Sequence, residues 1–152
     1  MRFFLLSIFI LMFILLDFIL LALNFPWPVY FGLAFISAAA FFFAVKEILP
    51  ASLLGGLIFD SLSVRYFGFY LLIFSLIVFL ADWLKPRLTP EAKKYFVVFF
   101  TLSALSVIYF FYFIFHRDNF IHPSFFIFLV LLNGFVSFIF AVILKNAWFK
   151  KI

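Results

Sequence analysis

Apolar segments long enough to cross a bilayer occupy most of this chain, and short polar or proline-containing stretches separate them. The first segment runs from about Phe3 to Leu23 and carries one charge inside it, at Asp17. Hydrophobic residues make up 70% of the sequence and charged residues 11%, whereas a soluble globular chain is nearer half apolar and a quarter charged. A chain of 152 residues cannot bury that much apolar surface in its own interior, so the bilayer has to be its solvent.

The breaks between the apolar segments predict a bundle of six transmembrane helices. A helix needs about 20 residues to cross a bilayer. The third segment is short and contains glycine, so by itself it also fits a re-entrant segment. Thr89 and Pro90 are typical of a helix start, with threonine as N-cap and proline in the first helical position. We therefore predict one all-α polytopic membrane domain over residues 1–152, with spans at about 3–23, 29–45, 48–62, 66–84, 95–115 and 123–144.

The positions of the basic residues favour six crossings over a re-entrant third segment. With six crossings and a cytoplasmic N-terminus, nine of the eleven Lys and Arg residues face the cytoplasm, and only Arg65 and Arg117 face outward. If residues 29–62 crossed once, the basic loop at 85–94 and the basic C-terminal tail would lie on opposite sides of the membrane. The positive-inside rule therefore predicts six crossings with both termini in the cytoplasm.

Several classes of chemistry lack the residues they need. Cysteine is absent, which excludes disulfides and cysteine-based metal sites. His116 and His122 do not have a ligand spacing of three or four residues, so no metal site is expected. The net charge of +5 comes from basic residues beside apolar spans rather than from a long basic run, which argues against nucleic-acid binding. No catalytic set is visible, so we expect neither an enzyme nor a bound cofactor.

Small residues and a carboxylate share one face of the third span. Ser52, Gly56 and Asp60 recur at helical spacing, Ser63 lies about one turn further, and Gly55 belongs to a parallel row. Such rows let helix backbones approach closely. A charge at the bilayer centre costs about 2.5–3.5 kcal/mol on insertion scales. Asp60 therefore either pins a packed junction or binds a partner helix near the outer surface, or else ends the helix in the headgroup layer as a solvated residue.

Polar residues in two other spans are candidates for contacts inside the bundle. Asp17 lies before the outer end of the first span, where it could pair with Arg65 or Arg117 or hydrogen-bond within the bundle. Asn133 and Ser137 share one face of the sixth span, as expected for a helix-packing seam. We expect structural polar contacts here rather than a ligand or proton site.

The third span and the loop after it resemble a known family. Gly56, Asp60, Ser63 and Gly68 match in spacing the pattern GLLxDLLSxxPLG of the rod shape-determining membrane protein MreD family. The proline of that pattern is Tyr66 here. The specific resemblance covers about residues 54–84, and elsewhere the likeness is in length, span number, polar loop and basic tail.

The resemblance implies a non-enzymatic scaffold subunit of the bacterial cell-elongation machinery in the inner membrane. Such a subunit would bind the single-span protein MreC and help to couple MreB filaments to peptidoglycan synthesis by RodA and a class B penicillin-binding protein. Its fold would be similar to the six-helix substrate-binding subunits of energy-coupling-factor vitamin transporters. That similarity also supplies an alternative, a subunit that captures a small vitamin-like molecule, although the short outer loops argue against it.

Overall fold

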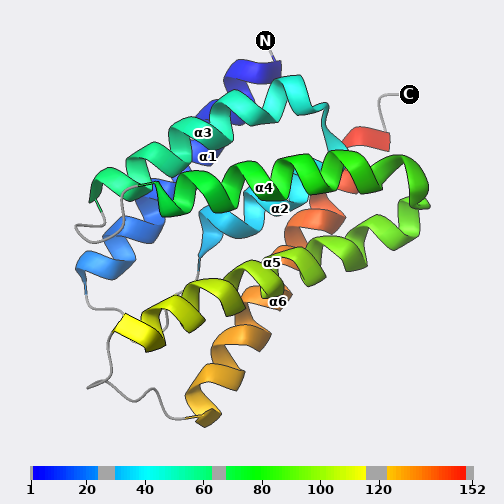
Figure 1. Ribbon diagram of the computed structural model, residues 1–152. Coiled ribbons are helices and arrows are strands. Elements are labelled where there is room, and N and C mark those ends of the chain that lie inside the picture. Colours follow the sequence, from blue (N-terminus) through cyan, green and yellow to red (C-terminus); the bar gives the residue numbers. More distant parts are fainter. Residues whose placement is uncertain (1, 24–29, 63–67, 116–122, 150–152) are drawn as a thin grey trace.

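Six α-helices and one 3-10 turn make up the described part of the chain, which in this computed structural model comprises residues 2–23, 30–62, 68–115 and 123–149 (Figure 1). The predicted all-α architecture is confirmed. The elements are α1 (Arg2–Ala22), α2 (Phe31–Phe42), α3 (Val45–Leu62), α4 (Phe69–Leu84), η1 (Lys85–Arg87), α5 (Pro90–Phe115) and α6 (Pro123–Phe149).

Helix α2 is the element around which the others pack. All of its residues from Gly32 to Phe41 are buried, and it contacts α1, α3, α4, α5 and α6. Its 12 residues are shorter than a membrane span, because they extend only about 18 Å against a hydrocarbon thickness of about 30 Å. A helix that is apolar on every side is expected in a core, and the small side chains of Ala38, Ala39 and Ala40 let its neighbours approach closely.

Within the residues that the structure describes, three helical stretches are long and apolar enough to cross a membrane. They are Phe69–Arg87, which joins α4 and η1, Pro90–Phe110 in α5, and Ile127–Asn146 in α6. Shorter apolar stretches cover Phe4–Leu20 in α1 and Phe31–Phe42 in α2. Large apolar side chains are exposed along α1, α4, α5 and α6, as expected for helices surrounded by lipid. The chain is therefore a helical membrane protein.

The junction between the second and third helices differs from the prediction. The sequence predicts a second span that continues to Val45, but α2 ends at Phe42 because Phe43 is extended, with φ −113° and ψ 163°. Lys46 and Glu47, which fall between the predicted second and third spans, lie in the first turn of α3. Glu47 is favourable there, because the positive end of the helix dipole stabilises a negative charge.

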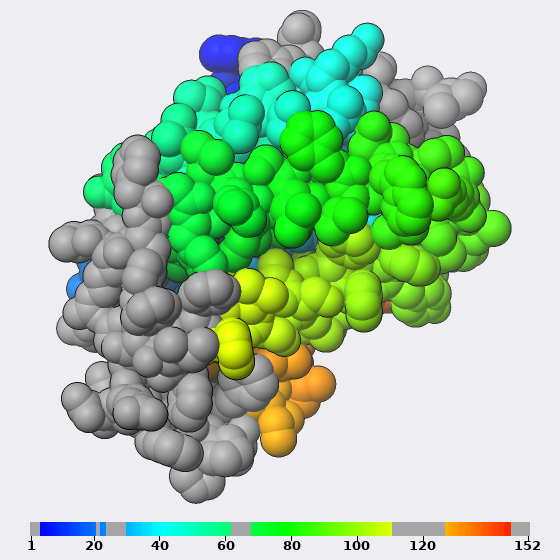
Figure 2. Space-filling view, in the orientation of Figure 1, coloured from blue at the N-terminus to red at the C-terminus, as the bar shows by residue number. Residues whose placement is uncertain are grey.

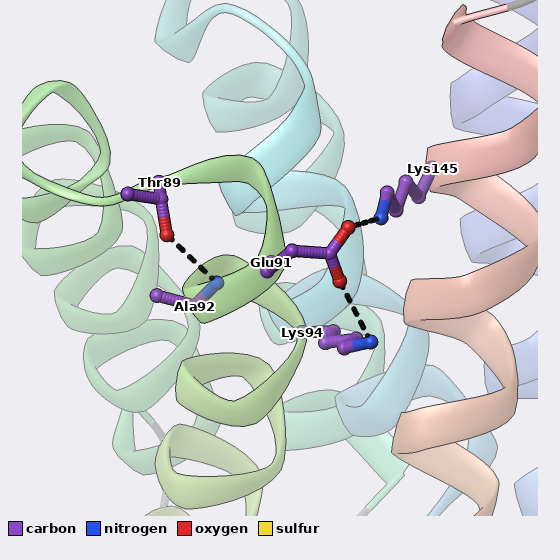
Figure 3. Close-up of polar contacts among 5 residues, drawn as sticks. All are labelled: Thr89, Glu91, Ala92, Lys94 and Lys145. Atoms are coloured by element: carbon purple, nitrogen blue, oxygen red, sulfur yellow. Dashed lines mark hydrogen bonds and ion pairs between the residues drawn. The ribbon is translucent and has the colours of Figure 1, made fainter.

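The start of α5 has the predicted cap. Thr89 Oγ1 accepts a hydrogen bond from the backbone N–H of Ala92 at 3.3 Å, and Pro90 takes the first helical position (Figure 3). The helix consequently begins before residue 95, where the apolar pattern alone placed it.

Ionic contacts gather at the end of the bundle where α5 begins. Glu91 pairs with Lys94 at 2.8 Å and also with Lys145, so it joins the start of α5 to the end of α6 (Figure 3). Lys85 Nζ donates to the backbone carbonyl of Phe43 at 3.1 Å, which joins the end of α4 to the α2–α3 junction. All Lys and Arg residues in the described part of the chain lie at this end, which we call the basic end: Arg2, Lys46, Lys85, Arg87, Lys93, Lys94 and Lys145.

Candidate functional site

Asp60 holds the start of helix α4. Its side chain is only 3% exposed, and its two carboxylate oxygens accept hydrogen bonds from the backbone N–H groups of Tyr70 at 2.9 Å and Leu71 at 3.1 Å. The first N–H groups of a helix have no partner within the helix, and the positive end of the helix dipole attracts a negative charge. Asp60 therefore satisfies two donors that would otherwise be costly in an apolar surrounding, and it does so from α3, across the helix–helix contact.

Two glycines permit this contact for different reasons. A Cβ added at Gly56 would lie 2.5 Å from the Cα and 2.8 Å from the backbone nitrogen of Leu71, so α3 and α4 touch there backbone to backbone. Gly68 has nothing within 4 Å of an added Cβ, but its φ of +93° is a conformation that side-chain-bearing residues rarely adopt. Gly56 thus provides close approach, and Gly68 provides the turn into α4.

The geometry refines the expectation for Asp60. The sequence places Asp60 at a packed junction after the third span, and its carboxylate bonds the backbone N–H groups of Tyr70 and Leu71 inside the first turn of α4. The alternative of a solvated helix end does not fit a side chain that is almost fully buried. Ser63, Arg65 and Tyr66 lie outside the described residues.

The predicted small-residue face of α3 packs against two different helices. Gly55 faces α1, because an added Cβ would lie 2.5 Å from Ile14 Cδ1 and 3.3 Å from Ile10 Cγ2. Gly56, next along the chain, faces α4. Ser52 is fully buried, and its hydroxyl donates to the carbonyl of Leu49 at 2.9 Å. In this chain the strip is therefore an internal packing face.

Asp17 does for α2 what Asp60 does for α4. Its side chain is 2% exposed, and it accepts hydrogen bonds from the backbone N–H groups of Phe31 at 2.7 Å and Gly32 at 2.8 Å. A Cβ added at Gly32 would lie 2.8 Å from Ile14 Cγ1 and 3.1 Å from Asp17 Oδ2. Of the expected alternatives for Asp17, the structure has the hydrogen bonds within the bundle. Arg65 and Arg117 lie outside the described residues.

Asn133 on α6 also binds the start of α2. Its Oδ1 accepts a hydrogen bond from the backbone N–H of Tyr30 at 2.8 Å, and its Nδ2 donates to the carbonyl of Leu129 at 2.9 Å. Ser137 Oγ donates to the carbonyl of Asn133 at 2.7 Å, and both side chains are fully buried. Three successive amides at the start of α2, those of residues 30–32, are thus bound by buried side chains from α1 and α6.

Two consecutive helix pairs therefore share one device, which we call the carboxylate cap. In α1–α2 and again in α3–α4, an aspartate near the end of the first helix binds the opening amides of the second, and a glycine makes the close contact beside it. This likeness between the two helix pairs was not predicted from the sequence, and neither was the close contact at Gly32. The available signal was an aspartate late in each of two apolar helices, each followed by another apolar helix.

The chemistry of this site is structural in character. Both carboxylates accept two backbone hydrogen bonds, and the residues that the structure describes contain no group of three or more His, Asp or Glu side chains placed to hold a metal ion. His116 and His122 lie outside those residues. Comparisons with known proteins add no relative, since no family model, no curated protein and no solved structure matches this chain.

Proposed function

We propose that this chain is a non-enzymatic scaffold subunit of the bacterial cell-elongation machinery, similar to MreD. The observation that carries the proposal is the joint between α3 and α4. Three of the four residues that match the family pattern act there as one unit, since Gly56 allows the contact, Asp60 binds the amides of Tyr70 and Leu71, and Gly68 makes the turn. A rigid two-helix joint would require residues of these kinds at this spacing.

MreC is the direct partner in this proposal. A scaffold has to present the same surface to its partner at all times, and capped helix starts with backbone-level contacts are suited to that because they leave few alternative packings. MreB, RodA and a class B penicillin-binding protein would be coupled indirectly, through MreC. The exposed apolar faces of α1, α4 and α6 are available to lipid or to a single-span partner helix.

The proposal includes an inner-membrane location with six crossings and both termini in the cytoplasm. The basic end supports it, because the described cations gather where the positive-inside rule places the cytoplasmic face. The buried carboxylates Asp17 and Asp60 lie late in α1 and α3, and both of these helices begin at the basic end. Helix α2, which is too short to span alone, would complete its crossing with the protein around it rather than with lipid.

The experiment is affinity purification of the tagged protein from membranes, with parent and Gly56→Leu compared at matched membrane levels. We expect MreC to co-purify with the parent and to be reduced with Gly56→Leu, together with loss of rod shape in cells that depend on the tagged copy. Gly134→Ala is the control, because an added Cβ there meets side chains rather than backbone, with Leu102 Cδ2 at 3.4 Å and Val98 Cγ1 at 3.6 Å. Recovery of an ATPase-coupling subunit in place of MreC would instead favour the small-molecule capture subunit.

A further inference from the structure

The exposed face of α4 is apolar along the helix and ends in a positive charge. Five exposed side chains follow it at helical spacing, which we call the α4 stripe: Leu72, Leu76, Phe79, Leu80 and Trp83. The stripe leads to Arg87 in η1, which is four residues beyond Trp83 and also exposed. Figure 2 views the molecule from the side on which α4 lies in front, as a green band that reaches the α4–α5 connection. The face is therefore apolar over about 17 Å, roughly the depth of one leaflet, and cationic at the basic end.

Arg87 and Trp83 form a defined pair. The guanidinium carbon of Arg87 lies 4.0 Å from the centre of the Trp83 ring, and Trp83 is 57% exposed. A cation over an indole face is attracted by the ring quadrupole. The stacking orders the guanidinium while its N–H groups stay free to bind an anion in a forked geometry.

Arg87 differs from several other cations at the basic end because it lacks a carboxylate. Lys85 pairs with Asp82, and both Lys94 and Lys145 pair with Glu91. Within the part of the chain that the structure describes, no acidic side chain pairs with Arg87. Its charge is thus available to an external anion at the level where Trp side chains mark the membrane interface.

We propose that the α4 stripe and Arg87 together bind an anionic phospholipid. The acyl chains lie along Leu72, Leu76 and Leu80, and the phosphate accepts hydrogen bonds from the Arg87 guanidinium beside Trp83. A lipid fits better than an acidic soluble protein, because the apolar stripe continues from the cation into the hydrocarbon region, where it matches acyl chains. Lys93, one turn into α5, adds positive charge near the same connection.

The experiment is native mass spectrometry of the purified full-length chain in detergent, titrated with phosphatidylglycerol or with phosphatidylcholine of the same acyl chains. We expect phosphatidylglycerol to bind more tightly than phosphatidylcholine. We expect Arg87→Gln to weaken that binding about fivefold, because this is the contribution of one cation to the affinity for an anionic surface. Lys46→Gln is the matched control, because Lys46 is an exposed cation at the basic end but lies on α3. It should change binding little.

Three results would overturn the proposal. Equal weakening by Lys46→Gln would mean diffuse surface attraction without a site, and equal binding of the two lipids by the parent would mean that charge plays no part. Displacement of the lipid by inorganic phosphate at millimolar concentration would mean that the headgroup alone is bound, without the acyl chains on the stripe. Two further variants keep the test independent of folding. Trp83→Phe retains an aromatic ring under Arg87, so it should bind phosphatidylglycerol more tightly than Trp83→Ala.

Discussion

Gly56 on α3 and Leu71 on α4 meet backbone to backbone. A Cβ at Gly56 would lie 2.5 Å from the Cα of Leu71, a separation that real Cβ atoms essentially never show. The amide of the same leucine is bound by Asp60, one turn further along α3. Close packing and the hydrogen bond thus act on one residue of α4, and each depends on the other for its geometry.

Substitution of Gly56 should cost more than substitution of a glycine that faces a side chain. Gly56→Ala pushes a methyl group into backbone atoms that cannot move aside, so we expect a loss of about 1–3 kcal/mol, and more for Gly56→Leu. Gly134→Ala should stay close to the parent, since its Cβ would make an ordinary contact with Leu102. Thermal unfolding in a mild detergent measures the difference. Equal stability of the two alanine variants would contradict the backbone contact.

Asp60 variants should rank by the number of amides they can still bind. The two oxygens of Asp60 bind separate N–H groups, on Tyr70 and Leu71, so Asn can replace one of these bonds and Leu neither. Each unsatisfied buried donor costs about 1–3 kcal/mol. We expect Asp60→Asn to keep part of the parent's rod-shape activity and MreC co-purification, and Asp60→Leu to lose both, at matched membrane levels. If Asn fails as badly as Leu, the negative charge itself is required.

Asp17 and Asn133 should be energetically coupled through the start of α2. They bind adjacent amides, those of Tyr30, Phe31 and Gly32, from α1 and α6. Removing either side chain should loosen the same helix start, so the double variant Asp17→Leu/Asn133→Leu should cost less than the sum of the single variants. The coupling expected for residues in one hydrogen-bond network is about 0.5–3 kcal/mol. A double-mutant cycle on unfolding in detergent measures it, and strict additivity would mean that α2 is held at two independent points.

Reporter fusions test the six-crossing topology. Fusions placed after Pro90 and after Ile152 should both report the cytoplasm, because the basic end would face that side. A fusion after Phe43 should also report the cytoplasm, since Lys85 bonds its carbonyl at the basic end. An external signal at any of the three positions would be incompatible with six crossings and cytoplasmic termini.

Glu91→Gln should have little effect on stability. Its side chain, which pairs with Lys94 and Lys145, is 65% exposed at the basic end, where solvent and salt screen ion pairs (Figure 3). We expect insertion and the unfolding temperature to stay near those of the parent, with any difference shrinking as salt is added. A large destabilisation comparable to that of Gly56→Leu would mean that this pair joins α5 to α6 more strongly than a surface contact should.

Local features of the sequence were sufficient to predict the helical class, the membrane environment and the cap of α5. Length and apolarity of a segment decide whether it can lie in lipid, and the pair Thr89–Pro90 marks a helix start without reference to any other part of the chain. The small-residue face of α3 was also predictable, because helical periodicity places Ser52, Gly56 and Asp60 on one side.

Periodicity does not say which neighbour a face meets, and there the tertiary structure decided. In the folded bundle, the adjacent residues Gly55 and Gly56 face different helices, α1 and α4, and the short helix α2 lies in the core. It also directed Asp17 and Asp60 to amides 10 to 15 residues further along the chain. Such bonds depend on how two helices dock across an intervening loop, and that docking is set by the packing of the whole bundle rather than by the residues that form the bond.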